Sequence, residues 1–103
     1  MTEPAEPVGE TSDRIIRTVG DHYGVTRADI VGLKRNKQIS TARNLSMYLL
    51  RQMASLSLPK IGELFSNRDH TTVMSNISSI EKRLRTEAEF AAEVAQIRRE
   101  LKQ

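Results

Sequence analysis

The sequence contains no cysteine, which excludes both a disulfide and a thiolate-ligated metal site. It also has no apolar run near the roughly 18 residues that a membrane-spanning helix needs. Its first ten residues are acidic and lack the hydrophobic stretch of a secretion signal. These absences predict a cytoplasmic protein with no membrane segment.

Two further absences bear on catalysis and cofactors. The chain has only two histidines, His22 and His70, and no cysteine, and this small set of ligands argues against a metal site. It has no Gly-x-x-x-x-Gly-Lys-Ser/Thr run, and therefore no ATP-binding loop of that type. Asp69 and His70 stand beside hydroxyl groups, but adjacent residues at a helix start point in different directions and form no base–orienter pair. We therefore predict no catalytic residue, no metal and no cofactor in this chain.

Positive charge is concentrated in the middle of the sequence. The chain carries 16 Lys+Arg and 13 Asp+Glu, for a formal net charge of +3. Residues 34–85 hold ten basic and three acidic side chains, whereas residues 1–13 hold four acidic and no basic ones. A basic middle between acidic or near-neutral ends is typical of a phosphate-binding surface. The alternative is a solvated surface that happens to be rich in lysine and arginine.

The length of 103 residues predicts one folded domain. Two of the three prolines and three glutamates fall in the first ten residues, so we expect residues 1–12 to form a disordered arm or linker. The domain then covers residues 13–103. Its apolar residues recur at helical spacing, with no strand-like alternation.

Capping residues and helix breakers divide this domain into about six helices. The expected N-terminal capping residues are, in chain order, Ser12 or Asp13, Thr26, Ser40 or Thr41, Ser57, Asp69, and Thr86 in a capping box with Glu89. Each helix is too short to be stable alone, so the fold class is all-α, a compact bundle. A polar basic loop, 34–38, should precede the third helix.

Two of the predicted helices, 58–65 and 69–84, are separated by a three-residue turn, which is the spacing of a helix-turn-helix. The second helix opens with polar residues, among them Thr71 and Thr72, which are poor helix formers. Their hydroxyl and methyl groups suit base edges and thymine methyl groups in a major groove. The alternative is an ordinary polar helix start with more capping groups than it needs.

The loop at 34–37 is a second candidate, because it carries three cations within four residues. Such a loop could bind phosphates or insert an arginine into a narrow A·T-rich minor groove, and the alternative is a solvated loop. Arg43, Arg51 and Lys60 lie on or near the helices that would flank a docked duplex. Each is either a phosphate contact or part of a soluble surface.

The second helix of the motif begins within the run Arg68-Asp69-His70-Thr71-Thr72-Val73, which follows Leu56-Ser57-Leu58-Pro59-Lys60-Ile61-Gly62. Together these runs resemble the carboxy-terminal DNA-binding domain of the bacterial replication initiator DnaA. Ala28-Asp29-Ile30, the basic loop, and Arg43 with Met47-Tyr48-Leu49 fall at the spacing of that family. The resemblance covers about residues 13–101.

The resemblance implies sequence-specific binding of double-stranded DNA at short, A·T-rich DnaA boxes of a replication origin. The helix 69–84 would lie in the major groove and the loop 34–37 in the minor groove. The positions that match or adjoin base-contacting residues are Arg35, Arg68, Asp69, His70, Thr71 and Thr72. Those that match backbone-contacting residues are Lys37, Arg43, Asn44, Arg51, Leu58 and Pro59, to which we add Lys34 and Lys60 for their charge.

The sequence departs from the family at three places. Thr41 stands where many relatives have a basic residue, Asn44 where glutamine is common, and Ser66 where glycine is common. The first two bear on affinity more than on specificity. Ser66 bears on the turn, although Asn67 can adopt the left-handed conformation there.

The resemblance also implies the partners. ATP is expected only in the AAA+ domain of a full-length initiator, and the isolated domain is expected to be a monomer that associates with the nucleoid. Two alternatives stay open. One is a protein-interaction module that docks through the apolar stripe running from Phe90 to Leu101 in the last helix, and the other is a stand-alone regulator built on the same fold.

Overall fold

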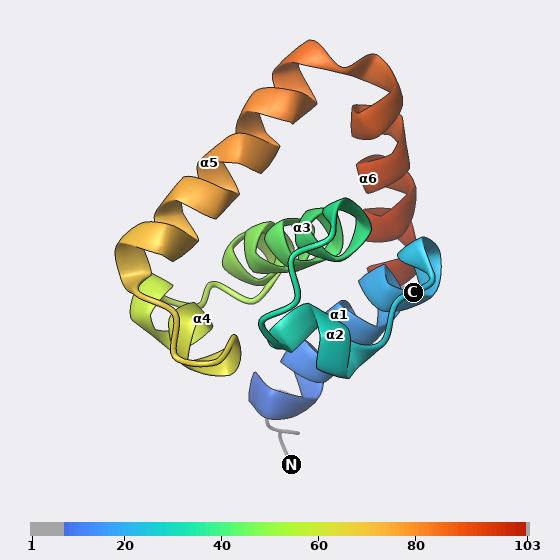
Figure 1. The fold of residues 1–103 in the computed structure, drawn as a ribbon. Helices are drawn as coiled ribbons and strands as arrows, with labels where there is room; N and C mark the ends of the chain where they lie inside the picture. Colours follow the sequence, from blue (N-terminus) through green and yellow to red (C-terminus); the bar gives the residue numbers. More distant parts are fainter. Residues whose placement is uncertain (1–7, 103) are drawn as a thin grey trace.

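Six α-helices make up residues 8–102, the part of the chain that the computed structural model describes (Figure 1). They are α1 (Val8–Tyr23), α2 (Arg27–Val31), α3 (Lys37–Met53), α4 (Leu58–Leu64), α5 (His70–Thr86) and α6 (Ala88–Leu101). No strand occurs within these residues. The prediction of an all-α bundle of about six helices is confirmed.

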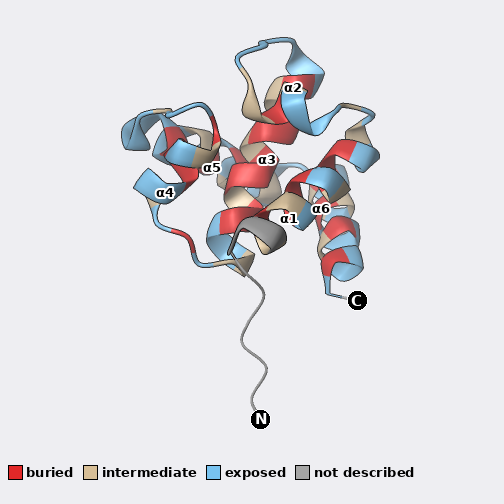
Figure 2. Ribbon diagram, turned by 90° about the horizontal axis from the view of Figure 1, so that it is seen from below, coloured by how far each residue is buried: buried red, intermediate tan, exposed pale blue. Residues whose placement is uncertain are grey.

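The central helix is α3, which packs against α1, α2, α4 and α5 (Figure 1). Its side chains Leu45, Met47, Leu49 and Leu50 are completely buried. Burial on several sides is what a helix surrounded by other helices requires. Each such leucine contributes on the order of 1.5–3 kcal/mol relative to an exposed one. Figure 2 shows buried residues along α3 and along the faces of the other helices turned toward it.

The last helix, α6, packs against α1 and α5. Its predicted stripe, Phe90, Val94, Ile97 and Leu101, is buried. Arg14 of α1 donates to the Leu101 carbonyl at 2.8 Å and so holds the C-terminal end of α6. The stripe therefore belongs to the core of this domain, and the protein-interaction alternative loses its main support.

The first helix begins earlier than predicted. α1 starts at Val8, not at Ser12 or Asp13, and Ser12 lies buried inside it. No breaker stronger than Gly9 follows the last proline before the helix, so the helix can extend upstream of the expected caps. Residues 8–12 of the expected disordered arm are therefore helical. The rest of that arm, 1–7, lies outside the described residues.

The start of α3 also differs from the prediction. Asn36 is the N-terminal cap, and its side-chain oxygen accepts the Ile39 amide at 2.8 Å. Asparagine caps as well as serine does, so the helix begins three or four residues before the predicted caps Ser40 and Thr41. Lys37 and Gln38, expected in the loop 34–38, therefore form the first turn of α3.

The capping box predicted at the start of α6 does not form. The Thr86 hydroxyl donates back to the Lys82 carbonyl at 3.0 Å, so Thr86 ends α5. Glu87 precedes α6 but makes no side-chain capping bond, because its carboxylate pairs with Arg83 at 3.0 Å. The other predicted caps are confirmed, and the residues concerned are Thr26, Ser57 and Asp69.

Candidate nucleic-acid interface

The turn between α4 and α5 is held by backbone hydrogen bonds to one carbonyl. The Gly62 carbonyl accepts the Phe65 amide at 3.1 Å and the Arg68 amide at 2.9 Å. Ser66 and Asn67 both have positive φ, 63° and 55°. The left-handed turn therefore includes Ser66 itself and is not confined to Asn67 as the sequence suggested.

The first turn of α5 presents a polar, solvent-exposed end. The Asp69 carboxylate accepts the Thr71 amide at 3.1 Å and also accepts the Thr71 hydroxyl. These two hydrogen bonds hold the pKa of Asp69 below its usual value. His70 and Thr72 are also exposed. The four residues at the start of α5 that were predicted to read bases thus lie together, but the Asp69 carboxylate is already engaged in ordering the helix end.

The loop that precedes α3 presents one unpaired cation. Lys34 pairs with Asp29 at 3.1 Å. The Arg35 side chain is exposed, and within residues 8–102 no group accepts a hydrogen bond from its guanidinium. The Ser40 hydroxyl donates to the Arg35 carbonyl at 3.4 Å and ties the loop backbone to α3. Of the two neighbouring cations, Arg35 is the one free to bind an external group.

A polar cleft of about 340 Å³ lies between this loop, the first turns of α3, and α5. We call it the arginine cleft, and its lining residues are Arg35, Ser40, Arg43, Asn44, Arg68, Thr72 and Asn76. Three of these residues are cations and none is an acid. Five were predicted as contact residues, whereas Ser40 and Asn76 were not. Asn76 follows Thr72 by one helical turn, and that spacing could have identified it.

In the cleft, the positive charge of one arginine disfavours the charged form of the next. Burial, and then the charge of Arg68, lower the pKa of Arg43. Burial, and then the charge of Arg35, lower the pKa of Arg68. Like charges that are partly withdrawn from water are relieved by a bound anion. The cleft is therefore electrostatically suited to a phosphate group.

Arg43 is not the surface cation that the sequence suggested. It is only 4% exposed, and its guanidinium donates to the Ile30 carbonyl at 2.7 Å and to the Asp29 carbonyl at 2.9 Å. Both acceptors lie near the C-terminal end of α2, where carbonyls lack helical partners. Arg43 therefore holds α2 against α3, and any contact it makes in the cleft comes in addition to that structural role.

Another group of predicted residues surrounds the start of α4. Leu58 is half-buried, and Pro59 and Lys60 are exposed. Arg51 donates to the Leu56 carbonyl at 2.8 Å, and its side chain lines a hollow of about 250 Å³ with Leu58 and the exposed Met74 of α5. These residues form a rim on the α4 side of the exposed end of α5.

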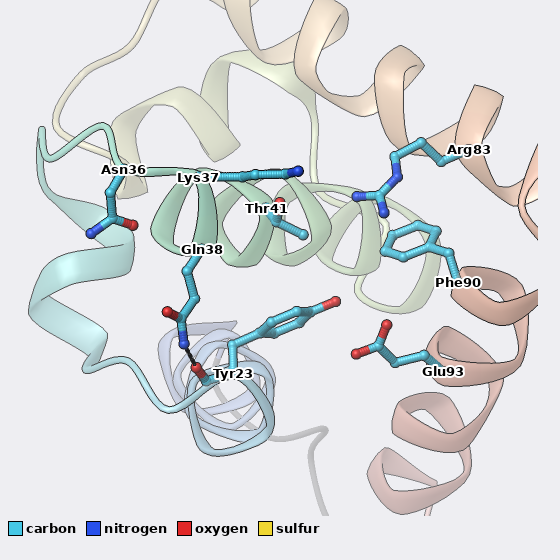
Figure 3. Close-up of a pocket in the computed structure, with 8 residues that line it drawn as sticks. All are labelled: Tyr23, Asn36, Lys37, Gln38, Thr41, Arg83, Phe90 and Glu93. Carbon is cyan, nitrogen blue, oxygen red and sulfur yellow. Dashed lines mark hydrogen bonds between the residues drawn. The ribbon is translucent and has the colours of Figure 1, made fainter.

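Lys37 belongs to a different hollow, of about 510 Å³ (Figure 3). There Lys37 and Thr41 of α3 face Arg83 of α5 and Tyr23 of α1. Arg83 lies over the Phe90 ring, with its guanidinium carbon 3.9 Å from the ring centre. Lys37 is thus separated from the arginine cleft, and the structure does not bring it together with Arg35 and Arg68.

Residues 8–102 contain no group of three or more His, Cys, Asp or Glu side chains placed to hold a metal ion. No helix in that range is both long enough and apolar enough to cross a membrane.

A short helix, a tight left-handed turn and a helix with an exposed polar end define an all-helical domain of the helix-turn-helix class. Comparison with known proteins identifies the family. Residues 12–80 match the family described as the bacterial dnaA protein helix-turn-helix. The chain belongs to this family.

Similar curated proteins are replication initiators. The chromosomal replication initiator protein DnaA of Ruegeria pomeroyi is 42% identical over 91 residues, which is 88% of this chain and 19% of the relative. That of Cereibacter sphaeroides is 38% identical over 89 residues, which is 86% of this chain and 20% of the relative. The chain therefore spans about a fifth of the length of these relatives.

Solved structures share the fold. A crystal structure of a DNA replication initiation factor aligns with a TM-score of 0.82 at 34% identity, covering 91% of this chain and 29% of that one. A replication initiator DnaA bound to AMPPCP and single-stranded DNA aligns with a TM-score of 0.74 at 33% identity, covering 89% and 28%.

Proposed function

We propose that this chain binds double-stranded DNA sequence-specifically at DnaA-box-like, A·T-rich sites of a replication origin, and that it thereby initiates or regulates DNA replication. The observation that carries the proposal is the arginine cleft, which is lined by three cations and no acidic residue and adjoins the exposed end of α5. A phosphate bound there would place α5 against the adjacent groove. The relatives are replication initiators, which supports the same assignment.

The proposed contacts fall into two groups. The first turn of α5 reads base edges in the major groove through His70, Thr71 and Thr72. Asp69 orders that turn through Oδ2, which leaves Oδ1 to accept from a base. Arg35 enters the minor groove, where a narrow A·T-rich segment attracts an arginine. The proposed sugar–phosphate contacts, which fix register, are Lys34, Lys37, Asn44, Arg51, Leu58, Pro59 and Lys60, with Arg43 at the cleft. Arg68 is the remaining residue predicted to contact a base.

Duplex DNA is favoured over single-stranded DNA as the ligand of this chain. Proteins that bind single strands stack the bases on exposed aromatic rings. This sequence has no tryptophan, its two phenylalanines are buried, and Tyr23 and Tyr48 are half-buried. The relative bound to single-stranded DNA is more than three times as long as the segment it shares with this chain.

We assign no enzymatic activity and no cofactor to this chain. Two structural relatives are described as bound to AMPPCP, and this chain covers less than a third of each. ATP would then bind in the AAA+ part of such an initiator. We further propose that the domain by itself is a monomer and that it acts in the cytoplasm, on the DNA of the nucleoid.

Competition titration tests the proposal. The chain is titrated with a labelled duplex that contains a DnaA box, against unlabelled box duplex, a scrambled duplex of the same composition, and the single strands. We expect the box duplex to compete at least about 10³-fold better than the scrambled one, the lower end of specific recognition. Equal competition by box and scrambled duplex would refute sequence-specific binding. Stronger competition by the single strands would refute the duplex as ligand.

A further inference from the structure

Four successive carbonyls at the C-terminal end of α2, those of residues 29–32, are bound by side chains from elsewhere in the fold. Helix-end carbonyls have no partner within the helix and need one outside it. The Arg43 guanidinium donates to the carbonyls of Asp29 and Ile30. The next two carbonyls accept from residues of the turn between α4 and α5. The Ser66 hydroxyl donates to the Val31 carbonyl at 2.6 Å, and Arg68 Nη2 donates to the Gly32 carbonyl at 2.8 Å.

These last two bonds join segments far apart in the sequence. Ser66 lies 35 residues after Val31, and Arg68 lies 36 residues after Gly32. α2 itself packs against α1 and α3, so its polar link to the turn consists of these side-chain bonds. Arg68 is also fixed to its own turn, because Nη1 donates to the Phe65 carbonyl at 2.8 Å. Arg68 therefore bridges the turn and the end of α2.

The bridge has a defined place relative to the proposed DNA contacts. Gly32 begins the loop that carries Arg35, and Arg68 immediately precedes Asp69, the cap of α5. A movement of the start of the loop relative to α5 would have to break the Arg68 bond to Gly32. Both terminal nitrogens of Arg68 are occupied by protein carbonyls, which leaves its guanidinium poorly placed to bind a base edge with two donors.

We propose that Arg68 is a positioning residue, which fixes the Arg35 loop relative to α5 so that the two parts engage the duplex in a single register. The Ser66 hydroxyl adds a second bond between the same two segments. The inference rests on the proposed function, and it replaces a direct base contact of Arg68 with an indirect role exerted through Arg35.

The decisive variant is Arg68→Lys, which keeps the positive charge but cannot bind the Phe65 and Gly32 carbonyls in the same forked geometry. Arg35→Ala is the matched variant that removes the proposed minor-groove contact itself. Ser66→Gly is a milder second variant, because glycine suits the φ of 63° and only the hydroxyl bond to Val31 is lost. Circular dichroism and the thermal midpoint check that each variant is folded.

The probes are a box duplex and the same duplex with 2,6-diaminopurine in place of adenine. This base adds an amino group to the minor-groove edge and leaves the major-groove edge unchanged. We expect the replacement to weaken binding of the unmodified protein about tenfold, the scale of one specific contact. Arg35→Ala and Arg68→Lys should both become nearly insensitive to it, and Ser66→Gly should lose part of that sensitivity. Arg68→Lys should change little when added to Arg35→Ala.

The other outcomes are distinct. If Arg68→Lys keeps full sensitivity to diaminopurine and instead loses discrimination at a major-groove base change, Arg68 is itself a base contact and the proposal is wrong. If the unmodified protein does not distinguish the box from scrambled DNA, the proposed function fails, but positioning is still tested in the free protein. There, Arg68→Lys should shift the backbone amide NMR signals of residues 32–36, and unchanged signals would refute the link.

Discussion

Gly62 lies against the Arg68 carbonyl so closely that no other residue fits. A Cβ built on Gly62 would lie 2.1 Å from that oxygen, and the Gly62 carbonyl accepts the Arg68 amide at 2.9 Å. α4 and the start of α5 are thus packed backbone to backbone. The angle between the two helices of the motif depends on this contact.

Gly62→Ala is therefore expected to destabilise the domain by about 1–3 kcal/mol or more, because the obstructing atom is backbone and cannot swing aside. Gly24→Ala is the matched control. Gly24 has a φ of 71°, but its added Cβ would meet nothing closer than 3.8 Å, so only about 1 kcal/mol of backbone strain is expected. Urea unfolding followed by circular dichroism compares the two. If both variants lose the same free energy of unfolding, the contact with the Arg68 carbonyl is not the reason that position 62 requires glycine.

Arg43→Ala should mainly affect stability. The substitution leaves the Asp29 and Ile30 carbonyls without their donors, and unsatisfied buried groups cost roughly 1–3 kcal/mol each. Arg51→Ala is the control, because Arg51 is exposed and donates to one carbonyl only, so a loss below about 1.5 kcal/mol is expected. Thermal and urea unfolding give the comparison. A fully stable Arg43→Ala variant would contradict the structural role.

How far the sequence predicts this fold depends on the range of the interaction. The caps Thr26, Ser57 and Asp69 bind amides two or three residues away, so a local pattern identifies them. The local sequence does not predict where a helix begins when two residues near each other are both good N-terminal caps. Asn36 precedes Ser40, and nothing local says that the earlier one begins the helix.

Long-range contacts explain the other differences. The partners of Arg43 lie 13 and 14 residues away, so its burial has no signal in the local pattern of charge. Thr86 is a local exception, because its hydroxyl donates to the Lys82 carbonyl four residues back and Thr86 ends α5. The residues of the first turn of α5 were predictable, since their motif is contiguous. The arginine cleft that joins them to the loop forms only on folding.

The salt dependence of binding should be steep. If five or six cations neutralise phosphates, a log–log plot of duplex affinity against salt should have a slope of about −5. Lys60→Ala should reduce the slope by about one unit, because Lys60 is exposed at the start of α4. Lys82→Ala is the matched control, since Lys82 is exposed on α5 three turns beyond its start. A slope near zero would contradict phosphate contacts altogether.

The Tyr23 hydroxyl should ionise at an unusually high pH. Burial, and then the nearby Glu93 carboxylate toward which its hydroxyl points, raise the pKa of Tyr23 to about 12 (Figure 3). An unfolded tyrosine ionises near about 10. The stability that Tyr23 contributes is therefore complete below about pH 10 and is lost as the pH rises toward 12.

Phenolate absorbance measures this step directly, because the chain has no tryptophan. Tyr23→Phe should abolish the ionisation near pH 12, and Glu93→Gln should move it to lower pH by removing the carboxylate charge. If this ionisation persists in Tyr23→Phe, the assignment to Tyr23 is wrong.

The remaining prediction separates reading from folding at the exposed end of α5. The His70 side chain is 57% exposed and lies outside the buried set of α5, which is Val73, Ile77 and Ile80. His70→Ala should therefore change the free energy of unfolding by no more than about 0.5 kcal/mol. Affinity for the box duplex should fall by about 1–3 kcal/mol, while affinity for scrambled duplex should hardly change.

Thr71→Ala should lose specificity to a similar extent but differ slightly in stability. The Thr71 hydroxyl donates to the Asp69 carboxylate, whereas the capping bond from the Thr71 amide survives the substitution. A small additional loss is therefore expected, below the roughly 1 kcal/mol that removal of a whole cap costs. Lys82→Ala should leave the ratio of box to scrambled affinity unchanged. If His70→Ala unfolds the domain, or if neither variant alters that ratio, the first turn of α5 is scaffold and the bases are read by another surface.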